Sequence, residues 1–148
     1  PFGKIVPLSS ESPTLTYNTI GRHQSQLALT KICTNKSPWL MHCKVGEVYN
    51  IPISHGEGRF VASDEVIRQL IDNGQVATQY VDLNGEPTMD LAYNPNGSIC
   101  AIEGIISPDG RVLGKMGHTE RISSDTCVNV DGNKEQLLFK GGVDYFKL

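Results

Sequence analysis

The sequence predicts a layered α/β domain rather than a helix bundle or a β-sandwich. Segments rich in β-branched and apolar residues, which favour strands, are mixed with a helix that has a continuous apolar stripe. The 148 residues are enough for one hydrophobic core and few for two. No repeat, low-complexity tract or linker-like stretch divides them. We therefore expect one domain or a large piece of one.

The first 63 residues are expected to be mostly extended. An apolar run at 4–8 is followed by two segments, 15–20 and 26–34, in which β-branched and apolar residues predict strands. The same character continues through 44–63, which contains a glycine-punctuated stretch, "HGEGRF". This part of the chain therefore contributes strands to the predicted sheet.

One amphipathic helix is expected at 63–74. Ser63 is suited to cap its first turn, and the two acidic residues that follow interact favourably with the positive end of the helix dipole. The Asn73-Gly74 pair is typical of a helix stop. The apolar stripe, which we assign to the core, consists of Val66, Ile67, Leu70 and Ile71.

The second half of the chain predicts a strand, a hairpin and a second helix. The strand at 75–82 is followed by a tight-turn dipeptide, Asn-Gly. The hairpin pairs 101–107 with 111–117 around a Ser-Pro-Asp-Gly turn, in which proline presets φ and glycine tolerates a positive φ. The last segment, 134–148, is expected to be helical with an interruption at Gly141-Gly142.

Composition excludes several classes of function. The 13 basic and 16 acidic side chains give a formal net charge of -3, so there is no positive field to attract nucleic acid. No apolar stretch approaches the ~20 residues that span a bilayer, and no signal peptide is recognisable, so we expect a cytoplasmic protein with no membrane partner. The four cysteines form no Cys-x-x-Cys pair, which favours reduced, mostly buried thiols. His55 and Glu57 have no third ligand at a plausible spacing, so no metal site is expected.

A histidine and a glutamate stand two residues apart just after the second hairpin strand. If that strand continues, His118 and Glu120 project to the same face at the edge of the sheet. The carboxylate can then accept the imidazole Nδ1–H and leave Nε2 free to take a proton from a nucleophile. The spacing alone favours the plainer alternative, a surface ion pair worth under ~1 kcal/mol.

Several motifs in order along the chain resemble one family. They are "NTIGRHQSQ" (18–26), "NKSPWL" (35–40), "HGEGRF" (55–60), "NPNGS" (94–98) and "IEGIISPDGRVLGKMGHTER" (102–121). Together they closely resemble the glutamine amidotransferase domain of phosphoribosylformylglycinamidine synthase, an enzyme of purine biosynthesis. The resemblance implies a class I glutaminase-like (flavodoxin-like) three-layer fold, here partial, with a mixed sheet and covering helices.

The resemblance also implies a chemistry. A cysteine thiolate attacks the side-chain amide of glutamine, His118 activates the thiol and protonates the ammonia, and Glu120 orients the imidazolium. The ammonia passes to a synthetase site that uses ATP and Mg to convert formylglycinamide ribonucleotide to the amidine. Partners are therefore glutamine and the synthetase domain of the parent enzyme, with no cofactor in this chain. The family segment Pro-His-Pro-Glu-Arg reads Gly-His-Thr-Glu-Arg at 117–121, so both stiffening prolines are lost.

The nucleophile of this family stands on a Gly-x-Cys-x-Gly turn, and no such turn occurs in the sequence. Family order would place it upstream of the first residue. Residues 1–148 are therefore expected to be the C-terminal part of a single glutamine amidotransferase domain without its nucleophile, and to be inactive in isolation. A sheet edge left uncovered in such a part would favour self-association.

Six further residues are expected near the substrate by the same resemblance: His55, Glu57, Arg59, Asn94, Asn96 and Ser37. For each, a structural role in an ion-pair row, a turn or packing is an open alternative. Two other functions also stay open: a docking or regulatory module whose His–Glu pair no longer works, and a different hydrolase whose nucleophile comes from another chain.

Overall fold

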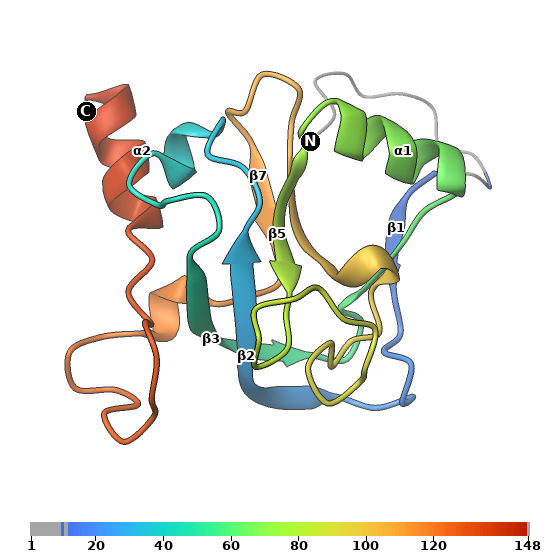
Figure 1. Ribbon diagram of the computed structural model, residues 1–148, viewed down its shortest axis with the longest axis horizontal. Helices are drawn as coiled ribbons and strands as arrows, with labels where there is room; N and C mark the ends of the chain where they lie inside the picture. Colours follow the sequence, from blue (N-terminus) through green and yellow to red (C-terminus); the bar gives the residue numbers. More distant parts are fainter. Residues whose placement is uncertain (1–9, 11, 148) are drawn as a thin grey trace.

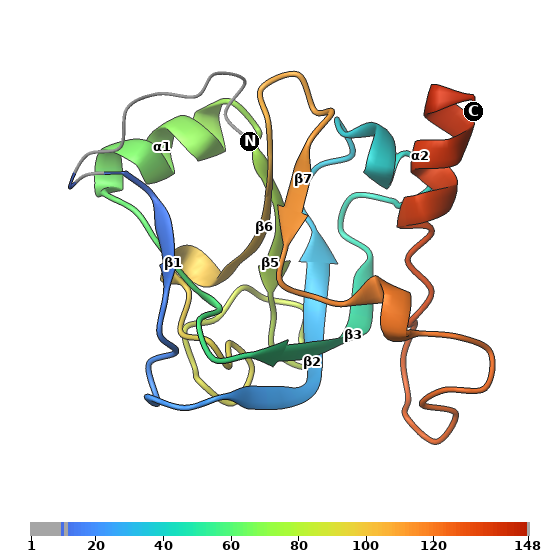
Figure 2. The ribbon, with the colours of Figure 1, turned by 180° about the vertical axis from the view of Figure 1, so that it is seen from behind.

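The computed structural model describes residues 10 and 12–147. The apolar run expected at 4–8 lies outside the described residues. The elements, labelled in Figures 1 and 2 where there is room, are β1 (Thr14–Thr16), β2 (Gln24–Ile32), η1 (Pro38–Leu40), β3 (Val48–His55), β4 (Arg59–Val61), α1 (Asp64–Asp72), β5 (Val76–Tyr80), η2 (Ile99–Ala101), β6 (Ile102–Ile106), β7 (Leu113–Lys115), η3 (Thr119–Arg121) and α2 (Leu138–Phe146), where η denotes a 3-10 helix.

The described strands form a five-stranded sheet in the order β3-β2-β5-β6-β7 and a separate pair, β1 and β4. The sequence predicts a mixed sheet, but all the strand pairs among residues 12–147 are antiparallel. The longest pairing joins β2 to β3, from Gln24 opposite His55 to Lys31 opposite Val48. His55 is the last residue of β3, so this pairing fixes its position.

Helices cover both faces of the large sheet, which gives the three layers expected. α1 and α2 stand on opposite sides of the sheet in Figures 1 and 2. Val76 packs in the cluster with Ile67 and Leu70 of α1, whereas its neighbour Ala77 packs with Leu138 of α2. Successive side chains of a strand point to opposite faces, so β5 contributes to both cores. The α/β class is confirmed.

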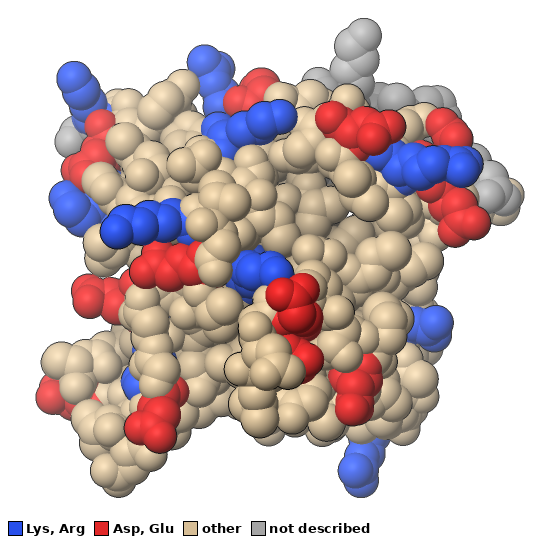
Figure 3. All heavy atoms as spheres, in the orientation of Figure 1, with Lys and Arg blue, Asp and Glu red and all other residues tan. Residues whose placement is uncertain are grey.

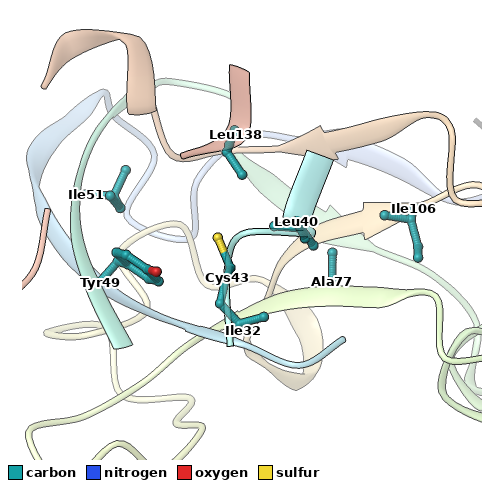
Figure 4. Close-up of a cluster of buried hydrophobic side chains, with 8 residues drawn as sticks. All are labelled: Ile32, Leu40, Cys43, Tyr49, Ile51, Ala77, Ile106 and Leu138. Carbon is teal, nitrogen blue, oxygen red and sulfur yellow. The ribbon is translucent and has the colours of Figure 1, made fainter. Parts of the chain in front are cut away.

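The core on the α2 side joins the sheet to η1 and to the start of α2 (Figure 4). Cys43 is 3% exposed and behaves as a small apolar side chain, as expected for a free thiol in a core. The members of this cluster are Ile32, Leu40, Cys43, Tyr49, Ile51, Ala77, Ile106 and Leu138.

α1 begins and ends as predicted. The Ser63 side chain accepts a hydrogen bond from the Val66 N–H at 3.4 Å, and Gly74 adopts φ +63° just after the helix. Of the predicted stripe, Ile67 and Leu70 are buried. Ile71, by contrast, is 57% exposed, so it lies outside the buried part of the stripe.

α2 differs from the prediction in where it begins and in its course through the two glycines. It begins at Leu138 instead of 134, and it continues through Gly141 and Gly142 instead of breaking there. The reason is packing against η1: a Cβ at position 141 would lie 2.7 Å from the Pro38 O, and one at 142 would lie 2.3 Å from the Trp39 ring. The glycine pair lets the helix approach η1 closely.

The surface carries both signs of charge and no membrane helix. Basic and acidic side chains are interspersed on the face shown in Figure 3. None of the helices within residues 12–147 is long and apolar enough to cross a bilayer.

We predict that Gly142→Val destabilises the protein by ~1–3 kcal/mol, because the new side chain must displace the Trp39 ring. Valine has a higher helix propensity than glycine, so an exposed site would show the opposite sign. The free energy of unfolding in urea checks this. As a control, Val143→Ala at a 57% exposed position should change the free energy of unfolding by less than ~0.5 kcal/mol. Equal effects of the two substitutions would contradict the packing explanation.

Candidate functional site

His118 and Glu120 are in direct contact. The His118 Nδ1 lies 2.7 Å from the Glu120 Oε1. β7 ends at Lys115, so strand alternation does not produce this contact, in contrast to the reasoning from the sequence. A turn of 3-10 helix, η3, follows His118 and folds Glu120 back toward the ring, and the His118 N–H donates to the Pro52 O of β3 at 2.8 Å.

A second histidine continues the contact on the far side of the ring. The His118 Nε2 lies 3.0 Å from the His55 Nε2, and the two rings stack with centroids 4.8 Å apart. The Ser54 N–H donates to the His55 Nδ1 at 3.3 Å. An ionised carboxylate can only accept, so the His118 Nδ1 carries the proton that Glu120 binds. A backbone N–H can only donate, so the His55 Nδ1 is an acceptor and the His55 Nε2 carries the proton that it donates to His118. The His118 Nε2 therefore presents a lone pair.

The electrostatics of the site favour this arrangement at neutral pH. Burial, together with the repulsion that two protonated imidazoles would experience, lowers the pKa of His55, so His55 is neutral at pH 7. Partial burial acts to raise the pKa of Glu120, but hydrogen bonds from its own backbone N–H and from His118, with the nearby Arg121, outweigh it and hold that pKa below its ordinary value. Glu120 is therefore ionised and accepts the His118 proton.

The pair opens onto a cleft of about 440 Å³. The His118 side chain is 26% exposed and the Glu120 side chain 52%, so a small molecule can reach both from this side. The cleft is lined by Trp39, Leu113, Gly114, Lys115, Gly117, His118, Thr119, Glu120, Leu138 and Phe139.

Only the first residue of the "HGEGRF" stretch reaches the His–Glu pair. His55 stacks on His118, as described above. Glu57 is exposed and has no hydrogen bond or ion pair with any described residue. Arg59 lies in β4 opposite Thr16, and its Nε is buried without a partner among the described atoms. His55, Glu57 and Arg59 therefore do not form the ion-pair row that was the alternative for these residues.

Asn94 and Asn96 are fully buried structural residues. The Asn94 side chain closes the turn by accepting from the Ser98 N–H at 3.0 Å and donating to the Ser98 O at 2.9 Å. The Asn96 Nδ2 donates to the Asn18 Oδ1 at 2.7 Å, and Asn18 donates to the His55 O at 2.6 Å. The turn therefore supports the backbone that carries His55 instead of touching the cleft.

Ser37 has a similar supporting role. It is 1% exposed, its hydroxyl donates to the Gly110 O at 2.7 Å, and it accepts from the Trp39 N–H at 3.3 Å. It thereby ties η1 to the hairpin turn and places Trp39 on the wall of the cleft. It does not contribute to the lining itself.

Reasoning from the sequence missed Glu103 and the buried, supporting role of Asn18. Glu103 is a charged residue within the apolar strand β6, and its side chain is completely buried behind the segment that carries His118. The available signal was a charged residue within an apolar strand pattern. Buried charged residues are rare and are usually paired, so such a residue indicates a buried interaction. No group of three or more histidine, cysteine or acidic side chains within residues 12–147 is arranged to hold a metal ion.

None of the four cysteines, all of which lie in the described part of the chain, hydrogen-bonds to His118. Burial raises the pKa of Cys33 to about 11 despite the nearby Lys31 ammonium. Burial also raises the pKa of Cys43. Raised pKa values make these two thiols poor nucleophiles, because the thiolate is the reactive form.

We predict that iodoacetamide alkylates the exposed Cys100 faster than Cys33 at pH 7.5. Since the pKa of Cys33 is about 11, its thiolate fraction and its alkylation rate should rise about tenfold for each pH unit between 7.5 and 9.5. Mass spectrometry of the labelled peptides measures both rates. A Cys33 rate that levels off below pH 9 would contradict the assignment.

Comparison with known proteins identifies the family. The sequence profile of the CobB/CobQ-like glutamine amidotransferase domain matches residues 1–146, and the chain belongs to this family. The likeness extends to named relatives. The phosphoribosylformylglycinamidine synthase subunit PurQ of Methanocaldococcus jannaschii is 37% identical over 134 residues, which cover 90% of this chain and 56% of the relative. The same subunit of Chlorobium chlorochromatii is 46% identical over 95 residues, 64% of this chain and 38% of the relative.

A solved structure shares the fold. "Structure of PurLQS from Thermotoga maritima" superposes with a TM-score of 0.67 at 26% identity and covers 91% of this chain and 53% of that chain. The glutamine amidotransferase fold expected from the sequence is thereby confirmed. The chain spans about half the length of the M. jannaschii relative and of the T. maritima chain.

Proposed function

We propose that the chain carries the acid–base half of a glutaminase that supplies ammonia to phosphoribosylformylglycinamidine synthase. The observation that carries the proposal is the Glu120–His118 hydrogen bond, which leaves the His118 Nε2 as a proton acceptor, engaged here by His55, on a residue that lines an open cleft. Membership of the glutamine amidotransferase family and likeness to PurQ subunits support glutamine as the substrate.

The chemistry follows from the tautomer. The His118 Nε2 takes the proton of a cysteine thiol as the sulfur attacks the amide carbon of glutamine. The resulting imidazolium gives that proton to the departing ammonia, and the Glu120 carboxylate, 2.7 Å from Nδ1, stabilises the cation in between. Water then hydrolyses the thioester, with His118 again acting as the base.

The nucleophilic cysteine comes from outside these 148 residues in this proposal. Cys33 and Cys43 have raised pKa values, and none of the four thiols is a hydrogen-bond partner of His118. Residues 1–148 then form the C-terminal part of one glutamine amidotransferase domain. His55 now contacts the His118 Nε2. It therefore occupies the place that the cysteine thiol must take to give its proton to this nitrogen.

The proposed partners follow from the same role. The synthetase, which binds ATP and Mg, receives the ammonia, and the protein works in the cytoplasm, where purine synthesis takes place. Self-association of the isolated chain would use the outer edge of β7, because the outer edge of β3 already accepts from the His118 N–H and donates from Asn50 to Asn133.

The test uses the full-length gene product and its His118→Ala variant. We expect the wild type to release ammonia from glutamine and the variant to do so ~10²–10⁴-fold more slowly, because general acid–base catalysis is lost. Trapping of the γ-glutamyl thioester by acid quench and mass spectrometry should give an adduct in the wild type alone. His42→Ala is the matched control, since this exposed ring contacts Asp144 of α2 and not the cleft.

Two outcomes would contradict the proposal. Equal ammonia release by wild type and His118→Ala would remove His118 from the reaction. A full-length wild type that neither hydrolyses glutamine nor forms the adduct would favour the docking or regulatory module considered above.

A further inference from the structure

Glu103 is a buried carboxylate whose contacts converge on the segment that carries His118. Its side chain is fully buried in β6. One carboxylate oxygen accepts a hydrogen bond from the Gly117 N–H, and the other accepts one from the Thr78 hydroxyl. The Lys115 ammonium lies 3.5 Å from the first oxygen. A buried charge is costly unless it is paired, and here every contact is a donor or a cation.

The hydrogen bond to Gly117 places Glu103 one peptide unit away from His118. The Gly117 N–H points to Glu103 in β6, and the next N–H, that of His118, donates to the Pro52 O in β3 at 2.8 Å. Two consecutive amides are therefore held by two different strands of the sheet. This fixes the backbone from which the imidazole projects toward Glu120.

Lys115 extends the same network to the other side of His118. Its ammonium donates to the Gly117 O at 3.3 Å and to the Gln136 Oε1 at 3.2 Å. The Thr119 hydroxyl also donates to the Gln136 Oε1, at 3.0 Å. Residues 117 and 119, which flank the histidine, are thus both bound to one buried polar network.

Position 117 requires glycine for two reasons in this arrangement. A Cβ there would lie 2.7 Å from the Lys115 Nζ and 2.8 Å from the Ile51 Cγ2. Proline at this position would also remove the N–H that donates to Glu103. Hydrogen bonds to Glu103 and Gln136 therefore hold the segment on both sides of His118.

We propose that Glu103, acting through Gly117 and Lys115, is a positioning residue for His118 in glutamine hydrolysis. The proposal rests on the glutaminase function proposed above and adds to it a residue that does not touch the substrate. Its role is to hold the His118 ring in line with Glu120, so its loss should slow the chemical step and leave glutamine binding unchanged.

The experiment compares the full-length wild type with its Glu103→Gln variant. Glutamine keeps the shape of the side chain but forms no ion pair with Lys115, and it offers one acceptor oxygen in place of the two that bind Gly117 and Thr78. We expect kcat for ammonia release to fall ~10–100-fold with KM within about twofold, as found when a supporting hydrogen-bond partner of a catalytic group is removed. Circular dichroism and thermal unfolding that match the wild type show that the variant is folded.

Glu135→Gln is the matched control. This exposed glutamate lies next to Gln136 in the sequence but outside the network, so its variant should keep wild-type kcat. If Glu103→Gln fails to fold, Thr78→Val tests the same proposal. This variant removes only the hydrogen bond to the second carboxylate oxygen of Glu103. We expect this variant to lower kcat by ~3–10-fold.

Wild-type kcat in Glu103→Gln, or in Thr78→Val where that variant is needed, overturns the proposal, as does a rise in KM at constant kcat. A full-length wild type without glutaminase activity counts against the proposed function instead. A crystal structure of Glu103→Gln then decides on Glu103: a His118–Glu120 contact lengthened beyond 3.5 Å supports positioning, and one unchanged at 2.7 Å contradicts it.

Discussion

The anchoring of residues 117 and 118 to two strands is the constraint on which the site depends. Glu103 of β6 holds the Gly117 N–H, and Pro52 of β3 holds the His118 N–H. β6 and β3 are not neighbours in the sheet, since β2 and β5 lie between them. The segment after β7 therefore crosses the sheet from one edge toward the other, and this crossing brings His118 to the end of β3, where His55 stands.

Buried polar groups support this site from both sides. Asn18 and Asn96 hold the backbone of His55 from one side, while Glu103 and Gln136 hold the neighbours of His118 from the other. A hydrogen bond has a narrow range of length and direction, whereas apolar packing tolerates sliding. Networks of this kind therefore fix the orientation of two rings more closely than a hydrophobic layer could.

Part of the fold could be predicted from local pattern and part could not. The α1 cap at Ser63, its stop at Gly74 and the hairpin turn at Gly110 depend on residues within a few positions of each other. The course of α2 could not be predicted in the same way. Gly141 and Gly142 read as an interruption because glycine has a low helix propensity, yet the contact with Trp39, about a hundred residues away in the sequence, makes them necessary.

The sequence by itself determined which groups are present: the His118–Glu120 spacing, the glycine-flanked His55 and the family to which the chain belongs. The tertiary structure decided how they meet. η3 replaces the expected strand between His118 and Glu120, His55 becomes the partner of the His118 Nε2, and Asn94, Asn96 and Ser37 become supports. The physical reason is that hydrogen bonds between residues 14 to 78 positions apart carry no signal in local periodicity.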